Sequence, residues 1–120
     1  MNHPGWLLRL AIVAMIAPET RGTDWPQWRG SQRDGVCRET GLLQQWPEGG
    51  PSLLWSSKDL GRGYSAPIVV GEGIYLAGDA NDELHIIALD REGRRVWRTR
   101  NGRAWKHPYP GARSSCTYSE

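Results

Sequence analysis

Short apolar or alternating runs dominate the chain from residue 52 onward. Each run is about four to seven residues long, and Gly, Asn and Asp separate successive runs. This pattern is typical of antiparallel strands joined by tight turns, and Gly and Asp are the residues that such turns need. The runs predict strands at 52–57, 66–71, 73–78, 84–90 and 95–100.

The turns between these runs predict how the strands connect. Hairpins are expected near Gly71 to Gly73, near Ala80 to Glu83 and within the segment 91–93, where turn residues interrupt the alternation. Residues 65–100 are therefore expected to form one four-stranded antiparallel meander without a helix.

The segment 23–51 has a different pattern. Between Asp24 and Pro51 it holds three Trp, three Pro and several Gly, with no sustained alternation. Such a segment cannot form a core alone. It is expected to be an irregular strap, with Trp25, Trp28 and Trp46 buried wherever a partner surface exists.

The first 22 residues resemble a targeting segment. An apolar run of eight residues, Leu10 to Ala17, follows Arg9, and it is shorter than the roughly 20 apolar residues that a membrane-spanning helix needs. Residues 1–22 are therefore expected to be a signal peptide, removed near Gly22, and the protein is expected to be periplasmic or secreted. An uncleaved N-terminus is the alternative.

Composition supports an all-β class. The chain has no Phe but seven Trp, 15 Gly and eight Pro, a mixture that suits short strands and turns better than helices. A net charge of +2 is too balanced to imply a nucleic-acid or membrane partner from bulk charge. Six Arg and one Lys lie between positions 91 and 106, which favours a solvent-facing outer strand over an anion-binding patch.

Candidate chemistry in the sequence is sparse. Cys37 and Cys116 are compatible with an oxidising compartment, but no metal-ligand spacing surrounds them. Three acids, Asp79, Asp82 and Glu83, are interpreted as a polar hairpin tip, because their spacing does not match a calcium-binding loop. The sequence predicts no catalytic residue and no metal site.

A repeat links two of the tryptophans. Trp55 in "LLWSS" and Trp97 in "RVWRT" are 42 residues apart, and "YPGARSSCTYSE" echoes "GRGYSAPIVVGE", with Ser115 and Ser65 in similar places. A period near 40 to 50 residues with four short strands per unit is the signature of a β-propeller blade. A tryptophan at this offset can dock each outer strand onto the adjacent blade.

The residues around the second tryptophan resemble a known family. The stretch "IIALDREGRRVW" is similar to the tryptophan-docking repeat of the pyrroloquinoline quinone (PQQ)-like propellers: Ala88, Asp90, Gly93 and Trp97 match, while the turn is one residue shorter and the usual Thr is missing. The opening from Asp24 and the motif "GYSAP" resemble the N-terminal part of PQQ-binding-like repeat proteins of planctomycete-type bacteria.

This resemblance implies a fold more firmly than an activity. The family contains quinoprotein dehydrogenases that hold PQQ and calcium on the propeller axis, and also members without a cofactor that act as interaction scaffolds. No catalytic or calcium-ligand motif of the dehydrogenases can be placed on this sequence. A non-catalytic module of the cell envelope with a protein or carbohydrate partner is therefore favoured, and the N-terminal part of a PQQ-dependent dehydrogenase is the alternative.

The length of the chain sets the expected domain organisation. Propellers close with four to eight blades, roughly 170 to 340 residues at this period. Residues 52–57 are expected to be the closing outer strand of the last blade, 58–100 the first blade, and 101–120 a connector and the start of a second blade. The chain is expected to be the N-terminal piece of a longer propeller, one that self-associates in isolation.

Overall fold

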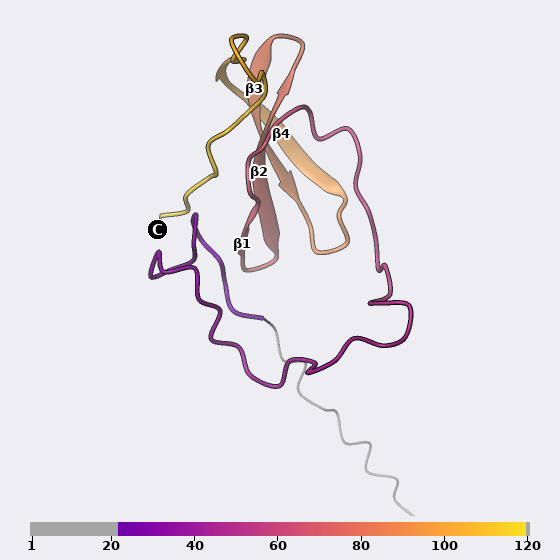
Figure 1. The fold of residues 1–120 in the computed structure, drawn as a ribbon. Coiled ribbons are helices and arrows are strands. Elements are labelled where there is room, and N and C mark those ends of the chain that lie inside the picture. Colours follow the sequence, from indigo (N-terminus) through magenta and orange to yellow (C-terminus); the bar gives the residue numbers. More distant parts are fainter. Residues whose placement is uncertain (1–21, 120) are drawn as a thin grey trace, which may run out of the picture.

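A computed structural model describes residues 22–119, so the predicted signal peptide lies almost wholly outside the described residues. One sheet organises the rest of the chain (Figure 1). Its strands are β1 (Ile68–Val70), β2 (Gly73–Ala80), β3 (Glu83–Leu89) and β4 (Arg95–Arg103), and no helix occurs among the described residues. The all-β prediction is confirmed.

The strands form an antiparallel meander in the order β1-β2-β3-β4, as the sequence predicts for residues 65–100. All three predicted hairpins are present. The β3–β4 pair contains two register irregularities, one at Leu84/His85 and one at Ala88/Leu89. Such bulges increase strand twist. Strand β4 extends to Arg103, three residues beyond the predicted end.

The core lies around the middle of the sheet. Ile68, Ile87 and Leu89 are almost completely buried, and Ala77 and Ala88 fill the small spaces beside them. Because these side chains come from β1, β2 and β3, the first three strands carry most of the packing. Strand β4 is largely exposed and forms one edge of the sheet.

The opposite edge is covered by other parts of the chain. Trp25 pairs with Val69 of β1 through two backbone hydrogen bonds of 2.7 and 3.1 Å. Upstream of β1, Arg62 pairs in the same way with Asp79 of β2, at 2.8 Å in both directions. Residues on the N-terminal side of β1 therefore also pair with β2, although pairing is interrupted at residues 63–67.

A glycine makes this second pairing possible. An ideal Cβ added to Gly78 would overlap the carbonyl oxygen of Leu60, which crosses β2 at this point. Glycine within a strand often marks such a close backbone approach. Gly78 thereby fixes where the segment that precedes the blade crosses the sheet.

The segment 52–57, predicted to be the closing outer strand of a last blade, forms no strand within residues 22–119. The Leu54 side chain within this segment is 89% exposed. A strand needs a hydrogen-bonded neighbour, and no described segment pairs with these residues. In the described residues beyond Arg103, predicted to be a connector and the start of a second blade, the one pairing is an isolated parallel bridge between Gly63 and Ala112.

The strap at 23–51 is irregular, as predicted, apart from the bridge at Trp25. Trp25 is partly buried, whereas Trp28 and Trp46 are 63% and 66% exposed. The expected burial of these two tryptophans was conditional on a partner surface, and neither finds one among the described residues.

Candidate functional site

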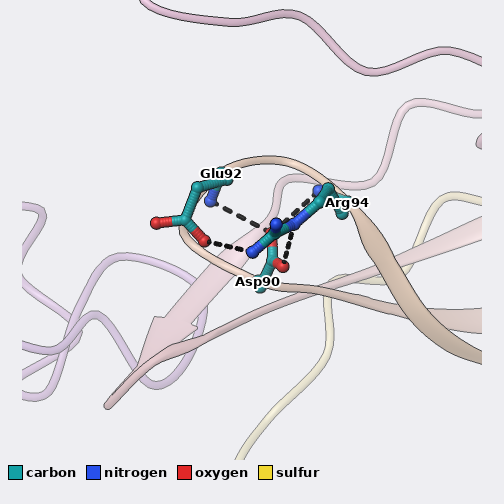
Figure 2. A network of polar contacts seen from close by, with 3 residues as sticks. All are labelled: Asp90, Glu92 and Arg94. Carbon is teal, nitrogen blue, oxygen red and sulfur yellow. Dashed lines mark hydrogen bonds and ion pairs between the residues drawn. The ribbon is translucent and has the colours of Figure 1, made fainter.

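A tight turn between β3 and β4 forms the first part of the candidate site (Figure 2). One carboxylate oxygen of Asp90 accepts hydrogen bonds from the backbone amides of Glu92 and Arg94, at 3.1 and 2.8 Å. The other accepts one from the Arg94 guanidinium at 2.7 Å, and this guanidinium also donates to Glu92 at 3.0 Å. Asp90 thus holds the turn closed from within, as Asp commonly does.

The Asp90 carboxylate makes this turn sensitive to acid. Partial desolvation raises the pKa of Asp90, but the hydrogen bonds and charge of Arg94 outweigh it, so that the pKa lies below its ordinary value. A depressed pKa means that the unfolded chain binds the proton more readily than the folded one. The stabilisation is therefore present above the unfolded pKa and is lost as pH falls through the folded pKa.

We expect the Arg94 amide proton to titrate with a midpoint below about pH 3.9, the value for an unperturbed Asp. NMR spectra recorded between neutral pH and pH 2 measure this midpoint. The control is Asp90→Asn, which keeps an acceptor but removes the titrating group, so the transition should vanish. A midpoint at or above the unperturbed value would contradict the expectation.

Trp55 lies against this turn. An ideal Cβ added to Gly93 would overlap the indole ring of Trp55, so the ring packs directly on the glycine backbone. Gly93 has a φ of 77°, a left-handed conformation that glycine adopts without strain. Glycine at this position therefore serves both the turn and the close approach of Trp55.

The structure thus brings together three of the five residues of the predicted repeat: Trp55, Asp90 and Gly93. The remaining two, Ala88 and Trp97, face each other across β3 and β4. Trp97 contacts Tyr75 at a ring-centroid distance of 6.0 Å and remains 43% exposed. No second turn of this kind covers Trp97 among the described residues.

Trp97 borders a groove on the face of the sheet that carries Tyr75. The groove has a volume of about 360 Å³, and Ile68, Tyr75, Ile86 and Tyr118 also line it. The backbone amide of Tyr118 donates to the Pro26 carbonyl at 2.9 Å, which joins the segment after residue 111 to the strap. An apolar groove therefore runs from Trp97 toward the chain's last described residues.

The two serines of the predicted echo perform similar roles. Ser65 Oγ accepts the backbone amide of Ala77 at 3.2 Å, and Ser115 Oγ accepts that of Ala66 at the same distance. Each hydroxyl thus replaces a backbone acceptor where regular strand pairing is interrupted. The sequence pattern located the two positions but did not indicate this role.

A second cleft lies near these serines. Its volume is about 380 Å³, and its walls include Ala77, Leu84 and Ile86. Asp79 also lines it, but both carboxylate oxygens are inaccessible and receive no hydrogen bond from the described residues. A carboxylate buried in this way is costly unless it is paired. Asp79 is the most unusual polar group of the sheet.

The three acids considered for calcium do not converge. Asp82 forms an ion pair with Lys106, and Glu83 forms one with Arg100, both at 2.7 Å. Within the described part of the chain, no group of three potential ligands is close enough to hold a metal ion. The acids occupy the β2–β3 hairpin and the strand ends beside it.

Both cysteines are free. Cys37 is exposed and Cys116 is partly buried, and burial raises the pKa of the Cys116 thiol. A higher pKa leaves less of the nucleophilic thiolate at neutral pH. Residues 22–119 contain no helix that is long and apolar enough to cross a membrane.

Comparison of the chain with protein-family models, with curated proteins and with solved structures finds no match.

Proposed function

We propose that the chain is the N-terminal part of a β-propeller of the PQQ-like type and works as a non-catalytic binding or scaffold module of the cell envelope. The observation that carries this proposal is the contact between Trp55 and the turn at Gly93. In the proposed arrangement, Trp55 belongs to the closing outer strand of the last blade, and residues 58–100 are the first blade.

The exposure of Trp97 supports the same arrangement. Trp97 occupies the repeat position that corresponds to Trp55, yet residues 22–119 contain one docking turn for these two tryptophans. In a propeller, the next blade would supply a turn for Trp97. Repeat units of this kind bury their faces against neighbours, and about three or more are needed for stability.

The non-catalytic role rests on the chemistry of the described residues. Asp82 and Glu83 are neutralised by cationic partners, and Asp79 is shielded from both solvent and donors. The hydroxyls of Ser65 and Ser115 both accept backbone amides. These contacts favour a structural role for the two hairpin acids and for both serines.

We expect this chain to bind PQQ only weakly and to show no dye-linked alcohol oxidation, with or without calcium. Cofactors of this size need largely preformed pockets that bury most of their surface, and one blade offers a single wall. The entropic cost of association, about 4 to 15 kcal/mol, would then remain largely uncompensated.

Titration of PQQ into the purified chain, followed by tryptophan fluorescence, measures this binding. N-acetyltryptophanamide at the same absorbance corrects for light absorbed by PQQ, and Trp97→Ala is a folding control. Saturable binding at micromolar PQQ, or calcium-dependent alcohol oxidation, would overturn the non-catalytic proposal in favour of a PQQ-dependent dehydrogenase.

A further inference from the structure

One end of the sheet contains a hollow that neither the docking turn nor the propeller arrangement uses. The β2–β3 hairpin and the chain that follows β4 meet at this end, away from the turns that join β1 to β2 and β3 to β4 (Figure 1). The hollow has a volume of about 550 Å³, within the usual range for small-molecule sites. Because blades pack through their sheet faces, a hollow at the strand ends stays open in a propeller.

Trp105 forms the aromatic wall of this hollow. Its side chain is 51% exposed, but its orientation is fixed by several contacts. The indole nitrogen donates to the Pro108 carbonyl at 3.3 Å, and the His107 ring meets the indole edge-on at a centroid distance of 5.3 Å. The Arg113 guanidinium lies 5.9 Å over the ring, and Arg113 does not line the hollow. The Trp105 ring is therefore fixed in orientation and still accessible to a ligand.

Paired charges surround this ring. Lys106 is bonded to Asp82, and Arg100 to Glu83, each at 2.7 Å. The Ala104 amide also donates to the Asp82 carbonyl at 3.0 Å, which ties the segment after β4 to the hairpin. These pairs place hydrogen-bond donors and acceptors side by side in fixed positions.

One cation of the hollow has no such partner within the described part of the chain. Arg103 lines the hollow, and no carboxylate among residues 22–119 lies within ion-pair distance of it. Apart from His107, the hollow is lined by three cations (Arg100, Arg103 and Lys106) and two carboxylates (Asp82 and Glu83), a net charge of 3 − 2 = +1. The surplus positive charge belongs to Arg103.

We propose that this hollow binds a saccharide that carries a carboxylate, such as a uronic acid. The apolar C–H face of a pyranose ring would stack on Trp105, as flat apolar surfaces do on exposed aromatic rings. Each sugar hydroxyl both donates and accepts, which suits the alternating donors and acceptors of the paired charges. The carboxylate would bind Arg103, since guanidinium groups recognise carboxylates through two parallel hydrogen bonds.

Other ligand classes fit these residues less well. A phosphate or sulfate ion would meet Asp82 and Glu83 as well as the cations, and it would leave the Trp105 ring unused. A purely apolar ligand would strip water from the charged rim without replacing those hydrogen bonds. The saccharide inference deepens the proposed binding role and rests on it, but it uses none of the docking residues.

Fluorine NMR of the full chain labelled with fluorotryptophan tests the inference, with the Trp105 signal assigned from Trp105→Phe. Digalacturonate should shift this signal in a saturable way, and neutral galactobiose should bind about tenfold more weakly, because it lacks the charge-assisted contact. Arg103→Gln should remove the preference for the acidic sugar.

Arg95→Gln is the matched control, because Arg95 is another exposed arginine of β4 that does not line the hollow. It should leave the preference unchanged. Absence of any saturable shift of Trp105 would overturn the saccharide site, while unchanged docking of Trp55 in the same spectra would leave the proposed fold standing. Equal affinity for both sugars, or an equal shift with inorganic phosphate, would overturn the assignment to an acidic saccharide.

Discussion

Gly78→Ala is expected to abolish the pairing between Arg62 and Asp79 and to destabilise the whole sheet. The added methyl group would occupy the position of the Leu60 carbonyl oxygen, which belongs to backbone and cannot rotate away. Either the segment at 60–62 leaves β2 or β2 itself shifts. Overpacking at a well-packed site costs about 1 to 3 kcal/mol, and we expect the upper end because the clash is with backbone.

Thermal melting followed by circular dichroism, with hydrogen exchange at the Arg62 and Asp79 amides, measures this effect. Both amides donate hydrogen bonds in the pairing, at 2.8 Å each, so both should lose protection. Gly41→Ala is the matched control: Gly41 has a φ of 75°, and an added Cβ meets nothing within 4 Å. It should cost only the backbone strain, about 1 to 2 kcal/mol.

If Gly78→Ala keeps both amides protected and melts no lower than Gly41→Ala, the close approach of Leu60 does not determine the fold.

The meander could be predicted from sequence because its determinants are local. Alternation over 73–78 and 84–90, with Gly and Asp at the breaks, specifies both the strands and the hairpins between them. Strand β4 ran three residues longer than predicted because Asn101 and Gly102 look like a turn, yet Gly102 and Arg103 still pair with β3. Pairing partners decided this end of the strand.

The segment at 52–57 shows where local reasoning stops. Its pattern is that of a strand, but a strand exists only with a hydrogen-bonded neighbour, and none of the described segments provides one. The tight approach of Leu60 to Gly78 was likewise invisible, because no local signal connects two residues 18 positions apart.

The candidate sites divide in the same way. The turn at Asp90 and Gly93 has a local signature, so the sequence located it, and the period of 42 residues linked Trp55 to Trp97. The hollow at Trp105 depends on contacts between the β2–β3 hairpin and a segment more than 20 residues later, such as Asp82 with Lys106. Exposed tryptophans and paired charges have no periodicity that reveals such a site.

The chain expressed from Asp24 to Glu120 is expected to self-associate. Two surfaces invite contact with another copy: the exposed edge of β4, and the apolar groove beside Trp97 and Tyr118. Edge strands are common sites of association. The edge is the weaker of the two here, because several arginines on β4 would face those of a second β4 and repel them.

Two opposing effects therefore set the salt dependence of this association. Repulsion between exposed arginines is screened over about 10 Å at 0.1 M salt, whereas burial of Trp97 in the groove of another copy depends little on screening. We expect oligomers at low salt already, and a further shift toward larger species as salt increases. Sedimentation velocity over a range of concentrations, together with thermal melting, measures both.

Substitution of Trp97 separates these contributions. Trp97→Ser should shift the distribution toward monomer, because this tryptophan is left without the docking turn that Trp55 occupies at Gly93. Trp28→Ser is the matched control: Trp28 is more exposed than Trp97 but belongs to the strap and does not line the sheet groove, so its loss should have little effect. A soluble monomer that unfolds cooperatively at all concentrations would contradict the expectation, because a single blade would then be sufficient for a stable fold and Trp97 would need no neighbour.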